Sequence, residues 1–261
     1  MSNITDHTID IQGCQSFYTR GGAGEPLLLL HGANGRDSWA PLQDTLAQHY
    51  DTIVPDHPGF GRSDSPDWID NISDLTFFYF DVLDALQIES CHLAGHSLGG
   101  WLAAELAVRQ PERFKSLSLC SAAGILVDDV PMGDVFMWNP EETIRNVFCT
   151  EAAQQRMLAM EPSVDELELI LRAREMSARL AWYPRFHNPD LVKWLHRLRM
   201  PVLIQWGDSD KIFPEAYAHA YGRLISGARI EVYPNCGHVP MVEATASYLE
   251  HFTGFLQEAS S

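Results

Sequence analysis

The sequence predicts one α/β domain with a mostly parallel central sheet and helices on both of its faces. Short apolar segments alternate with segments whose apolar residues recur every three or four positions, which is typical of strand–helix repeats. The run Pro26-Leu27-Leu28-Leu29-Leu30 is apolar throughout. A run without polar alternation indicates a central strand that is buried on both faces. With 261 residues, of which 46% are hydrophobic, the chain is long enough for one large core.

The first 120 residues alternate regularly between strand and helix patterns. The predicted order is a hairpin over 9–20, a strand over 26–32, a helix over 39–48, a strand over 52–56, a turn-rich loop over 57–64, a helix over 73–86, a strand over 91–94, a helix over 101–108 and a strand over 117–120. In the segment 73–86, for example, Leu75, Phe78, Val82 and Leu86 share one helical face.

The alternation stops after Gly124, and residues 125–188 show several helical segments and no clear strand. The plainest helix covers residues 163–183, with Val164, Leu167, Leu171 and Leu180 at helical spacing. The insertion is rich in methionine and aromatic residues: Met132, Phe136, Met137, Trp138, Phe148, Met157, Met160, Trp182 and Tyr183. An ordinary helical core is the simplest explanation for most of them. Placed over an active site, the segment would line it with soft apolar groups.

The alternation resumes after Pro189. The predicted elements are a helix over 191–197, a strand over 202–206, a helix over 214–224, a strand over 229–233 and a helix over 244–257. The sequence therefore predicts a core formed by residues 1–124 and 189–261, with residues 125–188 inserted into it.

Charge and cysteine content limit the partners and the compartment. Lys and Arg number 18 against 35 Asp and Glu, a formal net charge of −17, which argues against nucleic acid and anionic membranes as partners. The cysteines are Cys14, Cys91, Cys120, Cys149 and Cys236. Their odd number and scattered positions suit a reducing compartment. The first ten residues lack the pattern of a signal peptide, and no apolar stretch is long enough to span a membrane. The sequence therefore predicts a cytoplasmic protein with no membrane partner.

The segment Gly95-His96-Ser97-Leu98-Gly99-Gly100 joins a strand pattern to a helix pattern. This context makes Gly-x-Ser-x-Gly a nucleophile elbow, a turn so sharp that the serine backbone is strained. Side chains at Gly95 and Gly99 would collide where the strand and helix approach. Ser97 also lies at a helix N-terminus, whose partial positive charge favours a developing oxyanion. The alternative is a helix that is merely capped by Ser97.

A serine nucleophile needs a base, and the base needs an orienting acid. His238 lies in the loop between the last predicted strand and the last helix. Loops that follow parallel strands gather at the carboxyl edge of the sheet, where Ser97 is also expected. Asp208 and Asp210 follow another strand at the same edge. Either aspartate satisfies the chain order Ser, Asp, His.

Five motifs together resemble the α/β-hydrolase superfamily over nearly the whole chain. They are His31-Gly32-Ala33, Asp56-His57-Pro58-Gly59-Phe60-Gly61-Arg62-Ser63, Gly95-His96-Ser97-Leu98-Gly99-Gly100, Trp206-Gly207-Asp208-Ser209-Asp210-Lys211-Ile212-Phe213-Pro214 and Gly237-His238-Val239-Pro240. The resemblance implies an α/β-hydrolase fold in which residues 125–188 form a helical cap. It implies Asp210 as the acid, with Asp208 as the alternative. It also implies an oxyanion hole formed by the backbone N–H groups of Ala33 and Leu98.

The remaining histidines and the turn-rich loop are assigned structural roles. We expect His31 and His96 to stabilise the fold rather than to act as bases, and the segment from Asp56 to Asp64 to shape a turn near the site mouth. His92 and His96 are four residues apart but straddle a strand and a turn, so they do not form a metal-binding pair on one helical face. No cofactor or metal site is predicted.

The predicted reaction is hydrolysis of small to medium carboxylic esters through an acyl-enzyme, with Trp138 and Trp182 as cap residues that bind substrate. A serine at the elbow speaks against similar haloalkane dehalogenases and epoxide hydrolases, which use aspartate there. C–C hydrolases of the meta-cleavage type are one alternative, although the segment Ala33–Arg36, His96 and Val242 depart from their pattern. A lactonase or perhydrolase would use the same residues. A ligand receptor with vestigial hydrolysis is a further alternative, and a homo-oligomer is left open.

Overall fold

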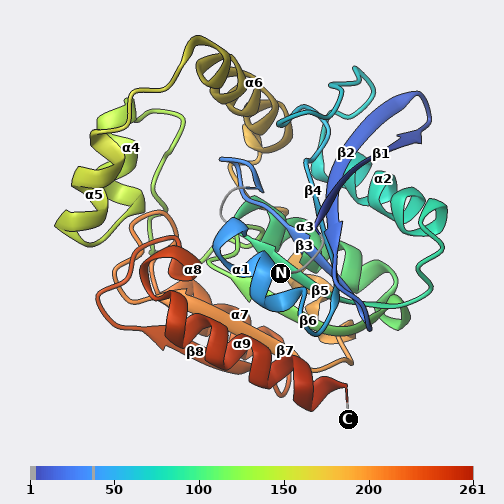
Figure 1. Ribbon diagram of the computed structural model, residues 1–261. Helices are drawn as coiled ribbons and strands as arrows, with labels where there is room; N and C mark the ends of the chain where they lie inside the picture. The colour runs from blue at the N-terminus through green and yellow to red at the C-terminus, as the bar shows by residue number, and fades with distance from the viewer. Residues whose placement is uncertain (1–3, 37–38, 261) are drawn as a thin grey trace.

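An eight-stranded sheet runs through the centre of the molecule (Figure 1). The computed structural model describes residues 4–36 and 39–260. The strands are β1 (Thr5–Ile11), β2 (Cys14–Gly21), β3 (Pro26–Leu30), β4 (Asp51–Pro55), β5 (Cys91–His96), β6 (Phe114–Cys120), β7 (Val202–Gly207) and β8 (Arg229–Tyr233). Their order across the sheet is β1-β2-β4-β3-β5-β6-β7-β8. The pairs β1–β2 and β2–β4 are antiparallel, and every later pair is parallel. The mostly parallel sheet predicted from the sequence is confirmed.

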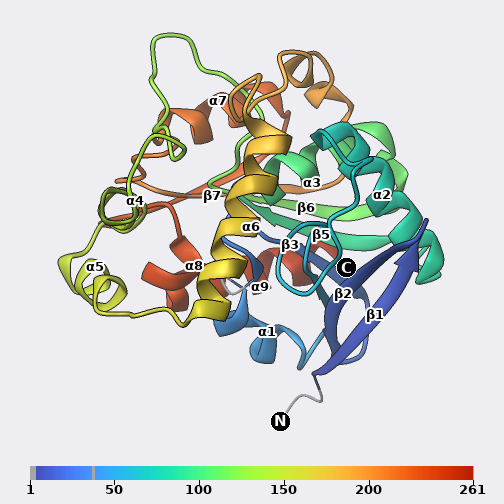
Figure 2. The same cartoon turned by 90° about the horizontal axis from the view of Figure 1, so that it is seen from above.

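Helices cover both faces of this sheet, as predicted. They are α1 (Ala40–Leu46), α2 (Ile72–Ala85), α3 (Leu98–Arg109), α4 (Pro140–Val147), α5 (Glu151–Leu158), α6 (Val164–Ala181), α7 (Ala216–Leu224), α8 (Pro240–Glu243) and α9 (Thr245–Ala259). Figure 2 shows α2, α3 and α7 on one side of the sheet and α1, α8 and α9 on the other. No helix in the described part of the chain is both long and apolar enough to cross a membrane.

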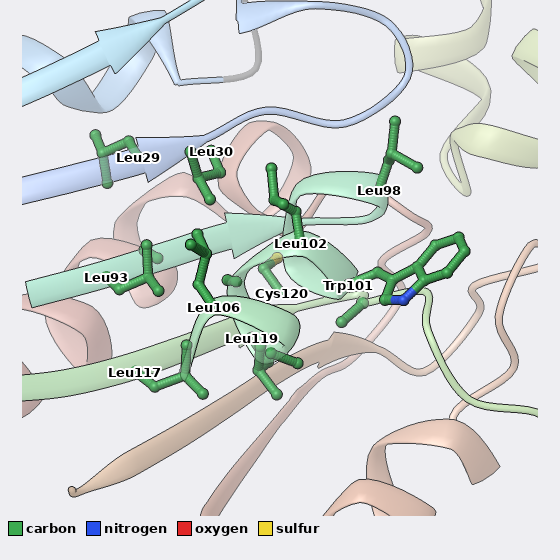
Figure 3. Close-up of a cluster of buried hydrophobic side chains, with 14 of the residues drawn as sticks. Leu29, Leu30, Leu93, Leu98, Trp101, Leu102, Leu106, Leu117, Leu119 and Cys120 are labelled. Carbon is green, nitrogen blue, oxygen red and sulfur yellow. The ribbon is translucent and has the colours of Figure 1, made fainter. Parts of the chain in front are cut away.

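The core is densest where α3 packs on the middle of the sheet. Leu29 and Leu30 of β3 are fully buried, as are Leu102 and Leu106 of α3, and Figure 3 shows them among the neighbouring side chains of β5 and β6. Burying a leucine side chain contributes about 1.5–3 kcal/mol. Because α3 is buried on every side, this apolar packing holds the turn between β5 and α3 in a rigid frame.

The segment 191–197 differs from the predicted α-helix. It forms two separate 3-10 turns, η3 (Leu191–Lys193) and η4 (Leu195–Arg197). Leu191 and Leu195 are buried as the helical spacing requires. However, a segment this short does not recover the cost of nucleating an α-helix, and short connectors commonly adopt 3-10 geometry instead.

Helix α6 also departs from expectation, because the first half of its predicted apolar face is exposed. Val164, Leu167 and Leu171 are 80%, 46% and 66% exposed, whereas Leu180 is buried. Local hydrogen bonds account for the helical start: Ser163 and Glu166 form a reciprocal capping box. The pattern predicted the helix correctly but not which of its apolar residues would be covered.

Helix α6 packs on the loop that follows β4. The Met176 side chain lies against Gly59, and the Arg172 guanidinium donates to the carbonyl oxygens of Gly61 (3.3 Å) and Ser63 (2.9 Å). A loop that follows a parallel strand lies at the carboxyl edge of the sheet. Helix α6 therefore lies over that edge, and α4 and α5 lie to one side of it (Figures 1 and 2).

Glu25, which directly precedes β3, is a source of pH-dependent stability. Its carboxylate pairs with Lys115 and lies 3.0 Å from His92 Nε2, and these two contacts lower the Glu25 pKa to about 2 from an ordinary value of 4.5. A carboxyl group whose pKa is depressed on folding stabilises the folded state above its unfolded pKa, and this contribution is lost as the pH falls through the folded pKa. We expect Glu25→Gln to lower the urea midpoint at pH 7, and the deficit to shrink between pH 4.5 and pH 2.

Urea titrations of the wild type and the variant at pH 7, 5, 4 and 3 measure this difference. Glu89→Gln is the control, because Glu89 is exposed and should leave the midpoint unchanged at every pH. A deficit for Glu25→Gln that stays constant from pH 7 to pH 3 would contradict the electrostatic explanation.

Candidate active site

Ser97 lies between the end of β5 and the start of α3 in a strained backbone conformation. Its φ is 54° and its ψ is −116°, a region that non-glycine residues rarely occupy. Hydrogen bonds hold this conformation from two sides. The Ser97 N–H donates to the Cys120 carbonyl of β6 (2.9 Å), and the Ser97 carbonyl accepts from the N–H groups of Trp101 (3.1 Å) and Ala123 (3.0 Å). The strained elbow predicted from the sequence is therefore present.

The glycines around Ser97 are required by the close approach of three backbones. A Cβ added at Gly95 would lie 2.1 Å from the Gly99 carbonyl oxygen. A Cβ added at Gly99 would lie 2.3 Å from the Leu30 carbonyl oxygen of β3. Both distances are far below van der Waals contact, as the sequence analysis predicted for these two positions.

His238 and Asp210 form a buried hydrogen-bonded pair. The Nδ1 atom of His238 lies 2.8 Å from Oδ2 of Asp210. The other carboxylate oxygen, Oδ1, accepts from the backbone N–H groups of Ile212 (2.8 Å) and Phe213 (3.0 Å). Since both oxygens are engaged, the carboxylate is held in one orientation. A proton on Nδ1 then leaves the lone pair of the imidazole on Nε2, which is the tautomer that a general base needs.

Asp208, the alternative acid, binds backbone instead of the imidazole. Its carboxylate accepts from the N–H groups of Asn235 (3.1 Å) and Cys236 (3.3 Å) and from the Ser209 hydroxyl (2.8 Å). Partial burial alone would raise the Asp208 pKa, but these hydrogen bonds outweigh it and lower the pKa. Asp208 thus ties the turn after β7 to the start of the histidine loop, residues 235–239.

His96 connects the elbow to the histidine loop. Its Nε2–H donates to the His238 carbonyl (2.8 Å), and the two rings are 5.0 Å apart. Burial, together with the neighbouring His238, lowers the His96 pKa to about 3, so its ring is neutral. A Cβ added at Gly32 would lie 3.1 Å from Ser97 Cβ and 2.9 Å from His96 Nδ1. The turn after β3, the elbow and the histidine loop therefore meet at one point.

The backbone N–H groups of Leu98 and Ala33 lie on two of these three elements. Leu98 is the first residue of α3, and the N–H of a first helical residue has no acceptor within its own helix. Ala33 is in the turn that directly follows Gly32. Both positions agree with the predicted oxyanion donors, whose role stays a prediction.

Two buried histidines brace the turn that carries Ala33. The His57 N–H donates to His31 Nε2 (3.0 Å), His57 Nε2–H donates to the His31 carbonyl (2.9 Å), and the Tyr79 hydroxyl donates to His57 Nδ1 (2.5 Å). Burial lowers the pKa of His31 well below its usual range and that of His57 to about 4, so both rings are neutral. The sequence analysis expected His31 to be structural but did not identify His57 and Tyr79 as its supports.

His92 lies in a separate network from His96. Its ring nitrogens contact the Ser116 hydroxyl (2.8 Å) and the Glu25 carboxylate (3.0 Å), whereas His96 contacts His238. The two histidines have no partner in common.

A row of aromatic rings leads from Trp182 at the end of α6 to His238. The Trp182 ring is 5.5 Å from Phe136, Phe136 stacks on Phe186 at 4.9 Å, Phe186 is 6.2 Å from Phe213, and Phe213 is 5.6 Å from His238. The sequence analysis singled out Trp182 but missed the three phenylalanines as site residues. Phe213 had a detectable signal, because it follows Asp210 within one motif.

Trp138 lies outside this row. It is partly buried, and its ring lies against Gly133, where an added Cβ would be 2.4 Å from Trp138 Cη2. The structure thus gives the two tryptophans different surroundings: Trp182 is 52% exposed and connected through rings to His238, and Trp138 packs within the inserted segment.

The different bonds of the two aspartates predict different effects of mutation. Asp210→Asn should lower kcat/KM on an aryl ester by on the order of 10³- to 10⁴-fold, because it removes the charge that orients and stabilises the His238 imidazole. Asp208→Asn keeps an amide oxygen that accepts a backbone N–H and should cost less than about tenfold, since one weakened hydrogen bond is worth about 1 kcal/mol. Steady-state kinetics of both variants measure this order, and equal losses or the reverse order would reassign the acid.

Comparison with known proteins places the chain among hydrolases. Residues 27–250 match the model of a family described as "Alpha/beta hydrolase family". The 2-hydroxymuconate semialdehyde hydrolase of Pseudomonas sp. (strain CF600) is 29% identical, over 92% of this chain and 89% of that protein. Lipase 1 of Psychrobacter immobilis is 28% identical, over 89% and 77% of the two chains. A solved meta-cleavage product hydrolase from Pseudomonas fluorescens IP01 superposes with a TM-score of 0.80 at 25% identity, covering 97% of this chain and 98% of that one.

Proposed function

Because this chain belongs to the alpha/beta hydrolase family, we propose that it is a serine hydrolase that cleaves carboxylic esters of small to medium size through an acyl-enzyme. The observation that carries the proposal is the buried Asp210–His238 pair, joined through His96 to the strained turn that presents Ser97. We include a cytoplasmic location in the proposal, which the odd number of scattered cysteines supports.

In the proposed reaction the Ser97 hydroxyl oxygen attacks the ester carbonyl while His238 Nε2 takes its proton. Asp210 stabilises the imidazolium that results, and the N–H groups of Leu98 and Ala33 bind the oxyanion. The C–O bond to the alcohol then breaks as His238 returns the proton to the departing oxygen. Water, activated by the same imidazole, attacks the acyl-enzyme, releases the acid and restores Ser97.

A C–C hydrolase is the second candidate, since two relatives of this chain have names of that class. The 2-hydroxymuconate semialdehyde hydrolase and the meta-cleavage product hydrolase both match it over more than nine-tenths of its length. Against this candidate stand the segment Ala33–Arg36, His96 and Val242, which depart from the pattern expected for meta-cleavage enzymes. A panel of aryl esters, a lactone and a dienol diketone, each assayed for kcat/KM, separates the two candidates and also tests lactonase activity.

Ser97→Ala is the primary test of the proposal. It should lower kcat for aryl ester hydrolysis by about 10⁴-fold or more, because no other group supplies the nucleophile at the elbow. Circular dichroism should show an unchanged fold, since the methyl group fits where the hydroxymethyl group was. A variant that keeps more than about a tenth of the activity would remove Ser97 as nucleophile, because tenfold corresponds to only about 1.4 kcal/mol. A wild type that binds but does not turn over any ester, and shows no burst, would favour a ligand receptor.

Substrate length is the second test, because we propose that Trp182 and Trp138 border the acyl site. The native chain should prefer short to medium acyl groups in a C2 to C16 series of aryl esters. Trp182→Ala should shift the optimum to longer chains, since it removes the outer end of the ring row that leads to His238. Trp138→Ala should change the profile less, and Trp194→Ala, a half-exposed tryptophan on η3–η4, serves as the control. A native optimum at C12 or longer would contradict the small acyl site.

A further inference from the structure

Every polar atom of His238 except Nε2 has a partner, and these partners come from three parts of the molecule. The ring Nδ1 contacts Asp210 after β7, and the carbonyl accepts from His96 at the elbow. The backbone N–H donates to the Val147 carbonyl at the end of α4 (2.8 Å). The inserted segment 125–188 therefore touches the backbone of the proposed general base directly.

Glu243, the last residue of α8, joins the same two segments with its carboxylate. Its Oε2 accepts from the Gly237 N–H next to His238 (2.8 Å). Its Oε1 accepts from the N–H groups of Cys149 (2.9 Å) and Thr150 (3.2 Å), which lie between α4 and α5. One carboxylate thus bridges the histidine loop and the stretch 147–150, which we term the cap linker.

Gly237 permits this contact because the two segments approach too closely for a side chain. A Cβ added at Gly237 would lie 2.4 Å from the Val147 carbonyl oxygen, 2.8 Å from Glu243 Oε2 and 2.9 Å from the Cys149 nitrogen. Such distances describe packed backbones with no intervening layer. A displacement of the cap linker would therefore be transmitted to the histidine loop.

We propose that Glu243 is a positioning residue that holds the cap linker and the histidine loop as one unit and so aims His238 Nε2 at Ser97. The proposal rests on the proposed function of Ser97 and His238. A carboxylate is suited to this task because each of its two oxygens accepts hydrogen bonds, one facing each segment. An amide has only one such oxygen, so Glu243→Gln can keep the bond to Gly237 or the bonds to the cap linker, but not both.

The test compares Glu243→Gln with Glu250→Gln, an exposed carboxylate on α9 as the matched control. The first readout is the second-order rate constant for labelling Ser97 by a small p-nitrophenyl phosphonate, which needs the base but little of the acyl site. We expect Glu243→Gln to lower this rate constant and kcat for a short aryl ester by about 10- to 100-fold, with KM changed less than about threefold, because small misplacements of a catalytic group cost rates of this size. Glu250→Gln should match the wild type.

A second pair of variants keeps the proposal testable if Glu243→Gln does not fold. Thr150→Pro removes the N–H that donates to Glu243, and Thr150→Ala removes only the hydroxyl that caps α5. Because both variants lose the cap, the difference between them isolates the bond to Glu243. We expect Thr150→Pro to label at least about threefold more slowly than Thr150→Ala.

Active-site titration and thermal melting identify a merely structural role. If the loss in Glu243→Gln equals the loss of titratable sites, with an unchanged rate constant per site, the positioning role is overturned. Labelling at wild-type rate in both Glu243→Gln and Thr150→Pro also overturns it. If instead the wild type is not labelled, or Ser97→Ala is labelled equally well, it is the proposed function that fails.

Discussion

The close approach of three backbones around Ser97 is the constraint on which the rest of the site depends. Holding a non-glycine residue at a φ of 54° costs about 1–3 kcal/mol. The hydrogen bonds of Ser97 to Cys120, Trp101 and Ala123 and the buried leucines of β3 and α3 offset this cost. Apolar burial in the middle of the sheet thus supports a strained polar turn at its edge.

Neutral buried histidines build the surroundings of the proposed charge relay. Burial holds His31, His57 and His96 in their uncharged forms, and each uses its ring nitrogens as one donor or one acceptor toward backbone or Tyr79. Neutral donors and acceptors orient loops without adding charge next to His238. The Asp210 carboxylate can then act on His238 without competition from neighbouring imidazolium groups.

The sequence predicted those features that depend on local geometry. The elbow, the sheet order of strands and helices, and the positions of Asp210 and His238 follow from short motifs, because tight turns and parallel-strand edges allow few residues and few placements. The supports were not predictable in the same way. Tyr79, Glu243 and the rings of Phe136 and Phe186 come from distant segments, and nothing in their local sequence indicates the partner that each one meets. The exposed apolar face of α6 was also missed, since helical periodicity predicts a face but not what covers it.

The side chains along the ring row bear on which acyl group the proposed enzyme would accept. Arg185 is the cation in this region, and its guanidinium lies 4.0 Å from the Trp182 ring and 5.0 Å from the Phe136 ring. It also lies 3.3 Å from an Asp134 carboxylate oxygen. A guanidinium that is already stacked and paired would have to give up these contacts to bind an anionic substrate. The remaining wall, formed by Phe186 and Phe213, offers apolar contact alone. This arrangement supports the proposed preference for neutral esters over substrates that carry a carboxylate beside the reacting carbonyl.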